Sequence, residues 1–500
     1  MTKPLSPIKR NSWKLVLALF WACLWLRGGV HAEASEGTYP CYEDGDIVGF
    51  IGDSITHVTY RSQGYVDMLE EYYLSRFPGR DVEFRNLGAD GHKITDFLNI
   101  YDSDPAFRGL GKAVIMLGTN EAILKIAPEE YIGNMEKLVA RLKEDGLAGG
   151  DILILSPPIC DQSCSKNFDK NGNMRWTYEG RLLEYIELLE TKAAEWGVGY
   201  LDLHTPMAEL TEEIQRENAD NTLTTDCIHP NALGHRLIAF YILQAQGEGT
   251  APLWEIVVPK EGDPQVIRSE LTDFYRGGKG LCATCHWETL PVAAAGEVAQ
   301  FRAFYEPGAL MCRMPLRVEG LEETASYTIW LDETKLGSFT GEELAAGIDL
   351  ATLETHPQQA IMEQINALSK KRHQAMAKHR NMWVEVMMQR ASFTQEQIDA
   401  SYRQWLENDE QLRNEMRTLA MDADKESFSL AILEEGYTLE ELKQEQTLER
   451  AKWEAAEQAR KEAAELARKE AEALMTNLAI DRHLEQTIRK IHQILPSFRK

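Results

Sequence analysis

A serine near the start of the chain stands where it could act as a nucleophile. It is Ser54, which ends a tight turn after the apolar run 47–51, and such a run is typical of a buried strand. A serine hydroxyl is a weak nucleophile unless an adjacent base takes its proton and a third group orients that base. Far downstream, Asp226 and His229 share one short segment, and on a helical turn their spacing would place both side chains on one face. The three residues could supply a nucleophile, a base and an orienting carboxylate.

The elements around these residues predict an α/β fold. From residue 46 to about 246, strand-like and helix-like segments alternate, which predicts a mostly parallel sheet covered on both faces. The strand candidates are 46–51, 82–87, 112–117, 151–155 and 199–203, and the helical patterns are 65–77, 128–145, 178–196 and 232–245. Ser54 follows the first strand, Gly88 to Gly91 the second, and Asn120 the third. Because sites in such sheets form at the carboxyl ends of the strands, we expect these polar clusters to share one edge.

These segments together resemble the SGNH hydrolases, the serine esterases also called the GDSL-like lipase/acylhydrolase superfamily. The resemblance rests on four blocks, which are Gly52 to Ser54, Asn86 to Gly91, Gly118 to Asn120, and Asp226 to His229. It covers about residues 46 to 246 and implies an SGNH-type three-layer α/β/α sandwich with a parallel sheet. A softer similarity, in residues 202–207 and 337–348, is to multi-domain secreted members of planctomycete-like bacterial type.

The resemblance also implies a role for each matching residue. Ser54 would be the nucleophile, and its own backbone N–H would be one donor of the oxyanion hole. Gly91 would give a second backbone donor, and Asn120 a third through its side-chain amide. His229 would be the general base, with Asp226 orienting its imidazole. Preorganised donors at a developing oxyanion are commonly the largest catalytic contribution, so the chemistry fits the residue types.

Several residues near these blocks have simpler alternatives. Asp226 could serve as the N-cap of the last helix of the domain. His57 could touch the substrate or only close the loop after the nucleophile, and we favour the second. We expect Asp53 to stabilise the turn. Cys227, beside the acid, is either an oxidation-sensitive point or a buried structural thiol, and we favour the structural thiol.

The second half of the chain changes character twice. Residues 250–350 contain short strand-like pieces separated by Gly, Pro and acidic turns, and they predict a small β-sandwich-like accessory domain. Residues 357–500 are helical and highly charged, with an Ala/Glu/Lys/Arg-rich stretch from Glu445 to Met475. Its apolar seam is thin for a coiled coil, so a solvated helix held by i,i+4 charge pairs and self-association of these helices both stay open.

A competing motif lies in the middle region, where Cys282, Cys285 and His286 form C-x-x-C-H. In an exported protein this pattern is the attachment site of a c-type haem, with the histidine as an axial ligand. The flanks resemble strands and turns and lack the helical frame of a small cytochrome. A strand that carries two cysteines, or a redox pair, is therefore the favoured interpretation.

The N-terminal segment, the cysteines and the net charge indicate where the protein is located and which partners it can bind. Basic residues precede the apolar run 15–26, and small residues follow it, which predicts a signal peptide over 1–32, with an uncleaved anchor as the alternative. Of eight cysteines, Cys23 lies in this leader, so seven remain and at least one lacks an intramolecular partner. Cys160 and Cys164 could bridge each other. The net charge of −26 argues against a nucleic-acid binder.

The sequence therefore predicts a secreted or periplasmic serine esterase that removes short acyl groups, such as acetyl, from a polar substrate such as a glycan. Three alternatives stay open: a lysophospholipase or lipase-like acylhydrolase, a non-catalytic envelope binding protein, and a c-type haem protein. We expect no cofactor, no metal and no stable membrane span after signal cleavage. Helix-mediated self-association is a further expectation.

Overall fold

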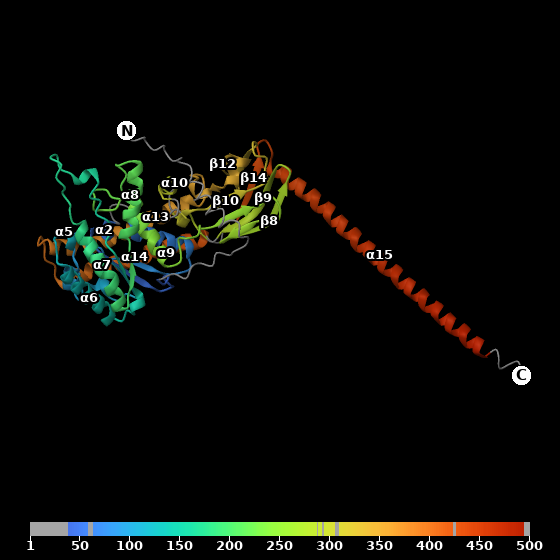
Figure 1. Cartoon of the computed structure of the whole chain (residues 1–500), viewed down its shortest axis with the longest axis horizontal. Helices are drawn as coiled ribbons and strands as arrows, with labels where there is room; N and C mark the ends of the chain where they lie inside the picture. Colours follow the sequence, from blue (N-terminus) through green and yellow to red (C-terminus); the bar gives the residue numbers. More distant parts are fainter. Residues whose placement is uncertain are drawn as a thin grey trace, which may run out of the picture. The chain divides into compact units, whose positions relative to one another are not determined.

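The computed structural model describes residues 39–58, 64–287, 289–292, 295–305, 310–423 and 427–494 (Figure 1). The leader predicted for residues 1–32 lies outside them. The chain divides into two compact units, each assembled from separate stretches of sequence. The first takes in the chain up to Glu270, with His286–Arg317 and Gly347–Ser427, and the second takes in Leu271–Cys285, Val318–Ala346 and the chain from Phe428 onward. The predicted limits 46–246, 250–350 and 357–500 follow sequence character and stay predictions.

A five-stranded parallel sheet forms the centre of the first unit and confirms the predicted α/β fold. Its strands are β1 (Ile47–Gly52), β2 (Glu83–Asn86), β3 (Lys112–Met116), β4 (Ile152–Leu155) and β5 (Gly199–Leu201), in the spatial order β2-β1-β3-β4-β5. Phe50 of β1 lies opposite Asn86 of β2 on one side and opposite Val114 of β3 on the other. The turn after β1 therefore lies between the turns that follow β2 and β3.

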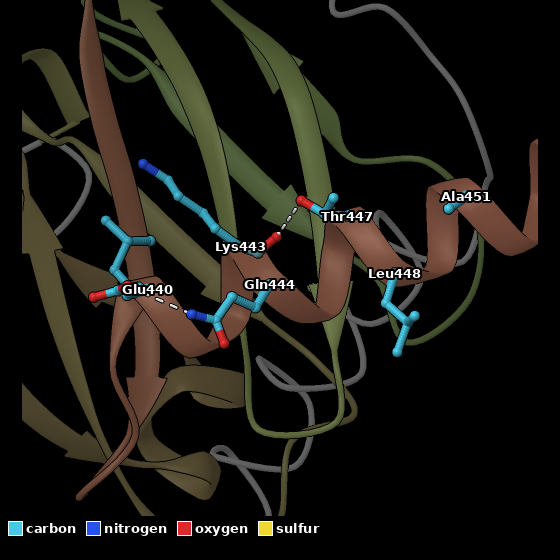
Figure 2. A pocket seen from close by; sticks show the side chains of 7 residues that line it. Glu440, Lys443, Gln444, Thr447, Leu448 and Ala451 are labelled. Atoms are coloured by element: carbon cyan, nitrogen blue, oxygen red, sulfur yellow. Dashed lines mark hydrogen bonds between the residues drawn. The ribbon is translucent and has the colours of Figure 1, made fainter.

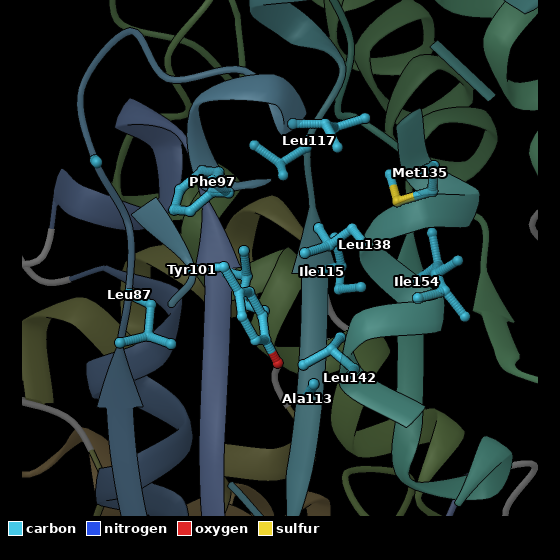
Figure 3. Packing of buried hydrophobic residues seen from close by; sticks show 14 of the residues in the cluster. Leu87, Phe97, Tyr101, Ala113, Ile115, Leu117, Met135, Leu138, Leu142 and Ile154 are labelled. Atoms are coloured by element: carbon cyan, nitrogen blue, oxygen red, sulfur yellow. The ribbon is translucent and has the colours of Figure 1, made fainter. Parts of the chain in front are cut away.

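One face of the sheet packs against three helices. These are α4 (Ile94–Ile100), α6 (Pro128–Glu144) and α7 (Glu179–Trp196). Ile115 of β3 and Ile154 of β4 share one buried cluster with Leu138 of α6 and Tyr101, which follows α4 (Figure 3). Burial of such side chains stabilises the fold by roughly 1.5–3 kcal/mol for each one.

The other face packs against α3 (Tyr65–Arg76) and α9 (Ala232–Ala245), which contact each other. Here Phe50 stacks on Phe84 with ring centroids 5.9 Å apart and meets Tyr65 edge-on at 6.0 Å. Strands buried on both faces carry near-continuous apolar runs, which explains why residues 47–51 alternate so little. The two faces together give the three-layer arrangement that the sequence predicted.

Two long helices from the second half of the chain also belong to the first unit. They are α13 (Gln359–Met387) and α14 (Gln395–Ala423), which pack against each other. Trp383 and Trp405 join the same hydrophobic core as the sheet. Arg372 of α13 is fully buried and pairs with Glu70 of α3 and Asp409 of α14. A buried charge is tolerated only when it is paired, so these contacts fix the register of the two helices on the sheet.

The antiparallel sheets expected from the middle region are present as well. The first unit contains β6 (Glu255–Val258), β7 (Gln265–Ile267), β10 (Pro315–Val318) and β13 (Ile348–Asp349), in the order β13-β10-β6-β7. The second sheet contains β8 (Ser269–Gly277), β9 (Gly280–Trp287), β11 (Ser326–Leu331), β12 (Thr334–Thr340) and β14 (Phe428–Glu434), in the order β12-β11-β14-β9-β8. β14 comes from the stretch predicted to be helical, where its apolar run pairs with β9 and β11.

The remaining elements are short, with one exception. They are α2 (Ser54–His57), α5 (Thr119–Ile123), α8 (His204–Glu217), α10 (Ala295–Phe304), α12 (Gly341–Ala346), and the 3₁₀ turns Pro105–Phe107, Gly149–Asp151, Ser165–Asn167, Leu310–Cys312 and Leu350–Thr352. The exception is α15 (Leu439–Ile494), a single helix of 56 residues. Within the described ranges, no helix is both long and apolar enough to cross a membrane.

Charge pairs four residues apart run along α15. Arg450 pairs with Glu454 at 3.1 Å, and Lys469 pairs with Glu465 at 2.9 Å. Near its start, Gln444 donates to Glu440 across one turn (Figure 2). Such pairs stabilise an isolated helix by about 0.2–0.5 kcal/mol each, so this helix has support that does not depend on tertiary packing.

Candidate active site

Ser54 lies at the carboxyl end of β1, where the strand ends and α2 begins. Asp53 caps α2 by accepting a hydrogen bond from the Ile55 N–H at 2.9 Å, which is the turn-stabilising role expected from the sequence. Gly52 is required at this turn, because a Cβ there would lie 2.0 Å from Thr56 Oγ1. The sequence therefore folds into a sharp strand-to-helix turn that presents the Ser54 hydroxyl at the edge of the sheet.

The hydroxyl of Ser54 meets the imidazole of His229. Ser54 Oγ lies 2.9 Å from His229 Nε2, and His229 Nδ1 lies 2.8 Å from Asp226 Oδ2. Oδ1 of Asp226 also accepts the backbone N–H groups of Ile228 at 3.1 Å and His229 at 2.8 Å. The acid and the base are thus held in one turn of chain, and a continuous hydrogen-bonded path links the carboxylate to the serine.

The segment that carries Asp226 and His229 is a loop before α9. Asn231 caps α9 by accepting from the Gly234 N–H at 3.0 Å, so Asp226 is not the cap of this helix. Cys227 between the acid and the base is buried and has a φ of +77°, a left-handed conformation that side chains seldom adopt. Its thiol hydrogen-bonds the thiol of Cys164, which lies in the loop after β4. Backbone strain of this kind is typical of functional loops.

The electrostatics of the pair favour an ionised acid. Burial raises the pKa of Asp226, but the hydrogen bonds from the ring and backbone of His229 outweigh it and hold the pKa at about 2. The hydrogen bond to Asp226 in turn raises the pKa of His229, against the effect of burial. An ionised Asp226 accepts the proton on Nδ1, which leaves Nε2 of a neutral His229 facing the serine hydroxyl as an acceptor.

Gly91 and Asn120 lie in the loops that flank this turn. Gly91 follows β2 with a φ of +75°, and Asn120 lies in the first turn of α5, after β3. Asn120 Nδ2 donates to the His92 carbonyl at 3.0 Å and so ties the two loops together. An amide nitrogen has two N–H groups, and the second makes no hydrogen bond among the described residues. Both predicted donors therefore belong to one connected rim beside Ser54.

Asn86 links this rim to the turn of the nucleophile. Its Nδ2 donates to the Thr56 carbonyl at 2.7 Å, and its Oδ1 accepts the Gly88 N–H at 2.9 Å. Gly88 is pressed so closely on the turn that a Cβ would lie 2.4 Å from the His57 nitrogen. The block after β2 thus holds the chain that follows Ser54 in place, a role of Asn86 that its position in the sequence does not reveal.

His57 has the geometry of the loop-closing alternative. It is 2% exposed, and its Nδ1 lies 2.8 Å from Asp90 Oδ1, which belongs to the loop after β2. The pair therefore joins the loop that follows Ser54 to the loop that carries Gly91.

The helix α13 supplies contacts to the rim that local sequence patterns did not reveal. Arg380 Nε lies 3.4 Å from the Gly88 carbonyl, and Arg380 also pairs with Asp104 in the interior. Met387, the last residue of α13, lies against Gly91. Glu121, next to Asn120, was missed as well: it is buried and accepts the Ile94 N–H at 2.7 Å. The only indication for Arg380 in the sequence is its position in the charged helical stretch 357–500.

The C-x-x-C-H motif does not fit a c-type haem. Cys282 and Cys285 both lie on β9, and they pair across the sheet with Ala431 and Phe428 of β14. Side chains alternate between faces along a strand, so two residues three apart project to opposite sides of the sheet. Haem attachment would require both sulfurs on one side, next to His286. The structure therefore favours the sequence interpretation of a strand that carries two cysteines.

Comparisons with known proteins agree with this geometry. Residues 50–237 match the GDSL-like Lipase/Acylhydrolase family, and this match includes Ser54 and the Asp226–His229 segment. This part of the chain is a domain of that family of ester hydrolases, and the protein is an enzyme of that class. No curated protein gave a significant match to the chain.

Solved structures also match the chain at low sequence identity. One is a gut microbial diltiazem-metabolizing enzyme, with a TM-score of 0.64 and 20% identity over 79% of this chain and 99% of that one. Another is an acetylxylan esterase from Geobacillus stearothermophilus, with a TM-score of 0.34 and 20% identity over 41% of this chain and 95% of that one. A third is an α/β hydrolase from the metagenome of Lake Arreo, with a TM-score of 0.34 and 24% identity over 41% of this chain and 97% of that one. The first of these likenesses shows that the fold extends well beyond residues 50–237.

Proposed function

We propose that the protein is a serine esterase that hydrolyses carboxylic esters through an acyl-enzyme intermediate. The observation that carries the proposal is the hydrogen-bonded path from Ser54 Oγ to His229 Nε2, at 2.9 Å, and from His229 Nδ1 to Asp226 Oδ2, at 2.8 Å. A nucleophile within reach of a base, which a third group orients, is the arrangement that activates a serine.

In the acylation step, His229 takes the proton of the Ser54 hydroxyl while Oγ attacks the ester carbonyl carbon. The carbonyl oxygen becomes an oxyanion, and the backbone N–H groups of Ser54 and Gly91 and the amide of Asn120 donate to it. Collapse of this intermediate breaks the C–O bond to the alcohol, which receives the proton from His229. Each such donor typically contributes about 10²–10³-fold to turnover.

Deacylation repeats these steps with water as the nucleophile. His229 takes a proton from water, hydroxide adds to the acyl carbon, and the second oxyanion occupies the same donors. Ser54 then leaves with the proton held by His229, and the carboxylic acid is released. Asp226 stays ionised throughout, since its pKa of about 2 lies far below that of an imidazolium.

The proposed substrate is a short acyl ester, such as acetyl, on a polar molecule such as a glycan. The loop after β4, residues 156–178, supports a polar substrate because Asp, Asn, Gln, Ser and Lys residues outnumber its apolar ones. A lysophospholipase or lipase-like acylhydrolase would use the same chemistry with an apolar groove for the acyl chain. A non-catalytic envelope protein would have no need for the intact path from Asp226 to Ser54.

Export and self-association complete the proposal. The basic and apolar pattern of residues 1–32 supports a secreted or periplasmic protein of the multi-domain type. Self-association through α15 stays a prediction. It is favoured because the apolar side chains of Leu448 and Leu466 are 58% and 59% exposed on this charged helix. Sedimentation of the mature chain, and the N-terminal residue of protein recovered outside the cytoplasm, test these two points.

The deciding experiment is hydrolysis of nitrophenyl esters of increasing acyl length by the wild-type protein and by Ser54→Ala. We expect the rate to be highest for acetyl and to fall in the variant by about 10⁶-fold, toward the uncatalysed rate. Equal rates for the two proteins would overturn the proposal. A rate that rises steadily from acetyl to long acyl chains would instead select the lipase-like alternative.

A further inference from the structure

A pocket of about 390 Å³ lies at the end of α5, the helix that carries Asn120, and has no role in the chemistry above. One wall comes from the end of α5, the helix whose first turn carries Asn120, and from Lys125 just after it. The other wall comes from Arg175, Trp176 and Tyr178, which end the loop after β4, and from Arg181 in the first turn of α7. Its volume is in the range of ligand sites for small molecules, about 300–1,000 Å³.

The aromatic wall of this pocket is fixed before any ligand arrives. Asn167, which is fully buried, accepts the Trp176 N–H at 2.8 Å, and its Nδ2 donates to the Trp176 carbonyl at 3.1 Å. The Arg175 N–H donates to the Asn167 carbonyl at 2.7 Å. Trp176 also meets Tyr178 edge-on, with ring centroids 6.4 Å apart. The hydrogen bonds therefore fix the backbone of Trp176, and the contact with Tyr178 orients its indole, so little conformational entropy is lost on binding.

The charge of the pocket is opposite to that of the whole chain. Lys125, Arg175 and Arg181 line it together with a single carboxylate, Glu184, which pairs with Arg181. Among the described residues, neither Lys125 nor Arg175 forms an ion pair. The chain as a whole has a formal net charge of −26, so three cations around one pocket stand out, even with Glu184 paired to Arg181 and Asp169 close enough to Arg175 to interact with it. These cations would attract an anionic ligand to the pocket.

Lys125 also has an unusual backbone. Its φ is +58°, in the left-handed region that non-glycine residues seldom occupy. The conformation follows the end of α5, where the Lys125 N–H bonds to the Ala122 carbonyl at 3.0 Å and the Ile126 N–H bonds to the Glu121 carbonyl at 3.0 Å. The strained residue is thus locked at the rim of the pocket, as is common for ligand-binding positions.

Tyr178 connects this pocket to the catalytic residues. It is buried, it hydrogen-bonds Cys160, and the carboxylate of Asp53 is near enough to contribute to the rise in the pKa of Tyr178, which is mainly due to burial. Asp53 directly precedes Ser54, and Asp161, next to Cys160, donates its N–H to the Cys227 carbonyl at 3.0 Å. Tyr178 thus lines the pocket and contacts Cys160, whose neighbour Asp161 is bonded to the segment between Asp226 and His229.

We propose that this pocket binds a carboxylated sugar unit of the ester substrate, so that the enzyme prefers acylated anionic saccharides to neutral ones. This inference rests on the proposed esterase function. The apolar face of a pyranose ring packs on the Trp176 indole, while the sugar carboxylate meets the guanidinium of Arg175 or Arg181 and the ammonium of Lys125. The fork of an arginine matches a carboxylate with two parallel hydrogen bonds, which gives orientation as well as attraction.

A matched pair of substrates tests the proposal. An acetylated oligogalacturonide and its carboxyl-reduced form have the same length and linkage but differ in charge. We expect the wild-type protein to have the higher kcat/KM on the anionic form, and Lys125→Ala and Arg175→Ala each to raise its KM by about two- to fivefold, the range of exposed ion pairs. Neither variant should change the rate on the reduced form or on nitrophenyl acetate.

Lys170→Ala is the matched control, because Lys170 is an exposed cation of the same loop that does not line the pocket. It should behave as wild type on both sugars. Equal kcat/KM on the two sugars in the wild-type protein, or equal effects of Lys170→Ala and Arg175→Ala, would overturn the proposal.

Binding separates this proposal from the esterase function. Calorimetry of the Ser54→Ala protein with the unacetylated oligogalacturonide should give a dissociation constant that weakens with added salt and on Arg175→Ala. The reduced oligosaccharide should bind more weakly. If no ester is hydrolysed but this preference is seen, the esterase function fails and the pocket assignment stands. If nitrophenyl acetate is hydrolysed but the two oligosaccharides bind alike, only the pocket assignment fails.

Discussion

Met387, the last residue of α13, lies directly against Gly91 in the loop after β2. A Cβ on Gly91 would be 3.2 Å from Met387 Cε, closer than side chains normally approach. Arg380, two turns earlier on the same helix, donates to the Gly88 carbonyl of that loop at 3.4 Å. The helix α13 lies outside residues 50–237 in the sequence, yet it supports the loop that holds one of the proposed oxyanion donors.

Gly91→Ala should reduce catalysis without unfolding the protein. Gly91 has a φ of +75°, so alanine there is strained, and its methyl group would also push on Met387. We expect kcat on nitrophenyl acetate to fall by about 10²-fold, as for loss of one oxyanion donor, with a small change in KM. Gly109→Ala is the control, because Gly109 has a φ of +73° and open space around it. A similar loss of kcat in both variants would show that backbone strain alone is responsible.

Arg380 should contribute to stability through a buried ion pair. Burial alone would raise the pKa of Asp104, but Arg380 and His379 outweigh it and lower the pKa to about 2. Arg380→Met leaves this carboxylate short of one partner, and we expect the free energy of unfolding at pH 7 to fall by about 3–5 kcal/mol. The double variant Arg380→Met, Asp104→Asn should recover much of that loss. Urea unfolding of wild type and the two variants measures these free energies of unfolding. A double variant as unstable as Arg380→Met would contradict the role of charge.

The same carboxylate gives a pH dependence of known sign. Its pKa in the folded state lies below the value in the unfolded chain, 3.8, so the unfolded state binds the proton more readily in acid. The stability from this pair is present above about pH 4 and is lost as the pH falls through the two values. Asp104→Asn should therefore show a shallower loss of stability than wild type between pH 4 and pH 2.

The sheet and the order of the polar blocks could be predicted from the sequence because both depend on local patterns. Apolar runs ending in small or polar residues identify strands in a buried parallel sheet, and topology then brings their carboxyl ends together. Ser54, Gly91 and Asn120 follow three strands that the structure places side by side. The Asp226–His229 spacing also depends on one short segment, although that segment is a loop and not the helical turn considered first.

Contacts between distant segments could not be predicted in this way. Arg380 and Gly88 are 292 residues apart, and Arg372 and Glu70 are 302 residues apart, so no periodicity connects them. The charges of α13 indicate a solvated helix when each is considered alone, since the partners that neutralise them lie on other elements. The strand β14 could not be predicted for a related reason, because it forms only by pairing with β9 and β11, which are distant in the sequence.

The rate should depend on the protonation of His229. The hydrogen bond that His229 donates to Asp226 raises the pKa of His229, and a protonated imidazole cannot accept the Ser54 proton. We expect kcat/KM to be constant above this pKa and to fall with a slope of one below it. Asp226→Asn removes the carboxylate, so the acid limb should move to lower pH while kcat falls by about 10³–10⁴-fold. A limb that stays at the same pH in the variant would exclude His229 as the titrating group.

Glu121 should make stability depend on pH near neutrality. Burial raises the pKa of Glu121 from 4.5 to about 7, although the Ile94 N–H donates to its Oε1 and opposes the shift. Because the folded-state pKa is the higher one, the folded protein holds this proton more tightly, and the stability it provides is lost as the pH rises through 4.5 and then 7. Glu121→Gln keeps the acceptor for Ile94 and has no charge to bury. We expect it to raise the free energy of unfolding by less than about 1 kcal/mol at pH 5 and by about 3 kcal/mol at pH 8.5. Urea unfolding at the two pH values measures this, and Glu129→Gln, on the exposed start of α6, should change neither. A gain at pH 5 equal to that at pH 8.5 would mean that packing, and not the buried charge, separates the two side chains.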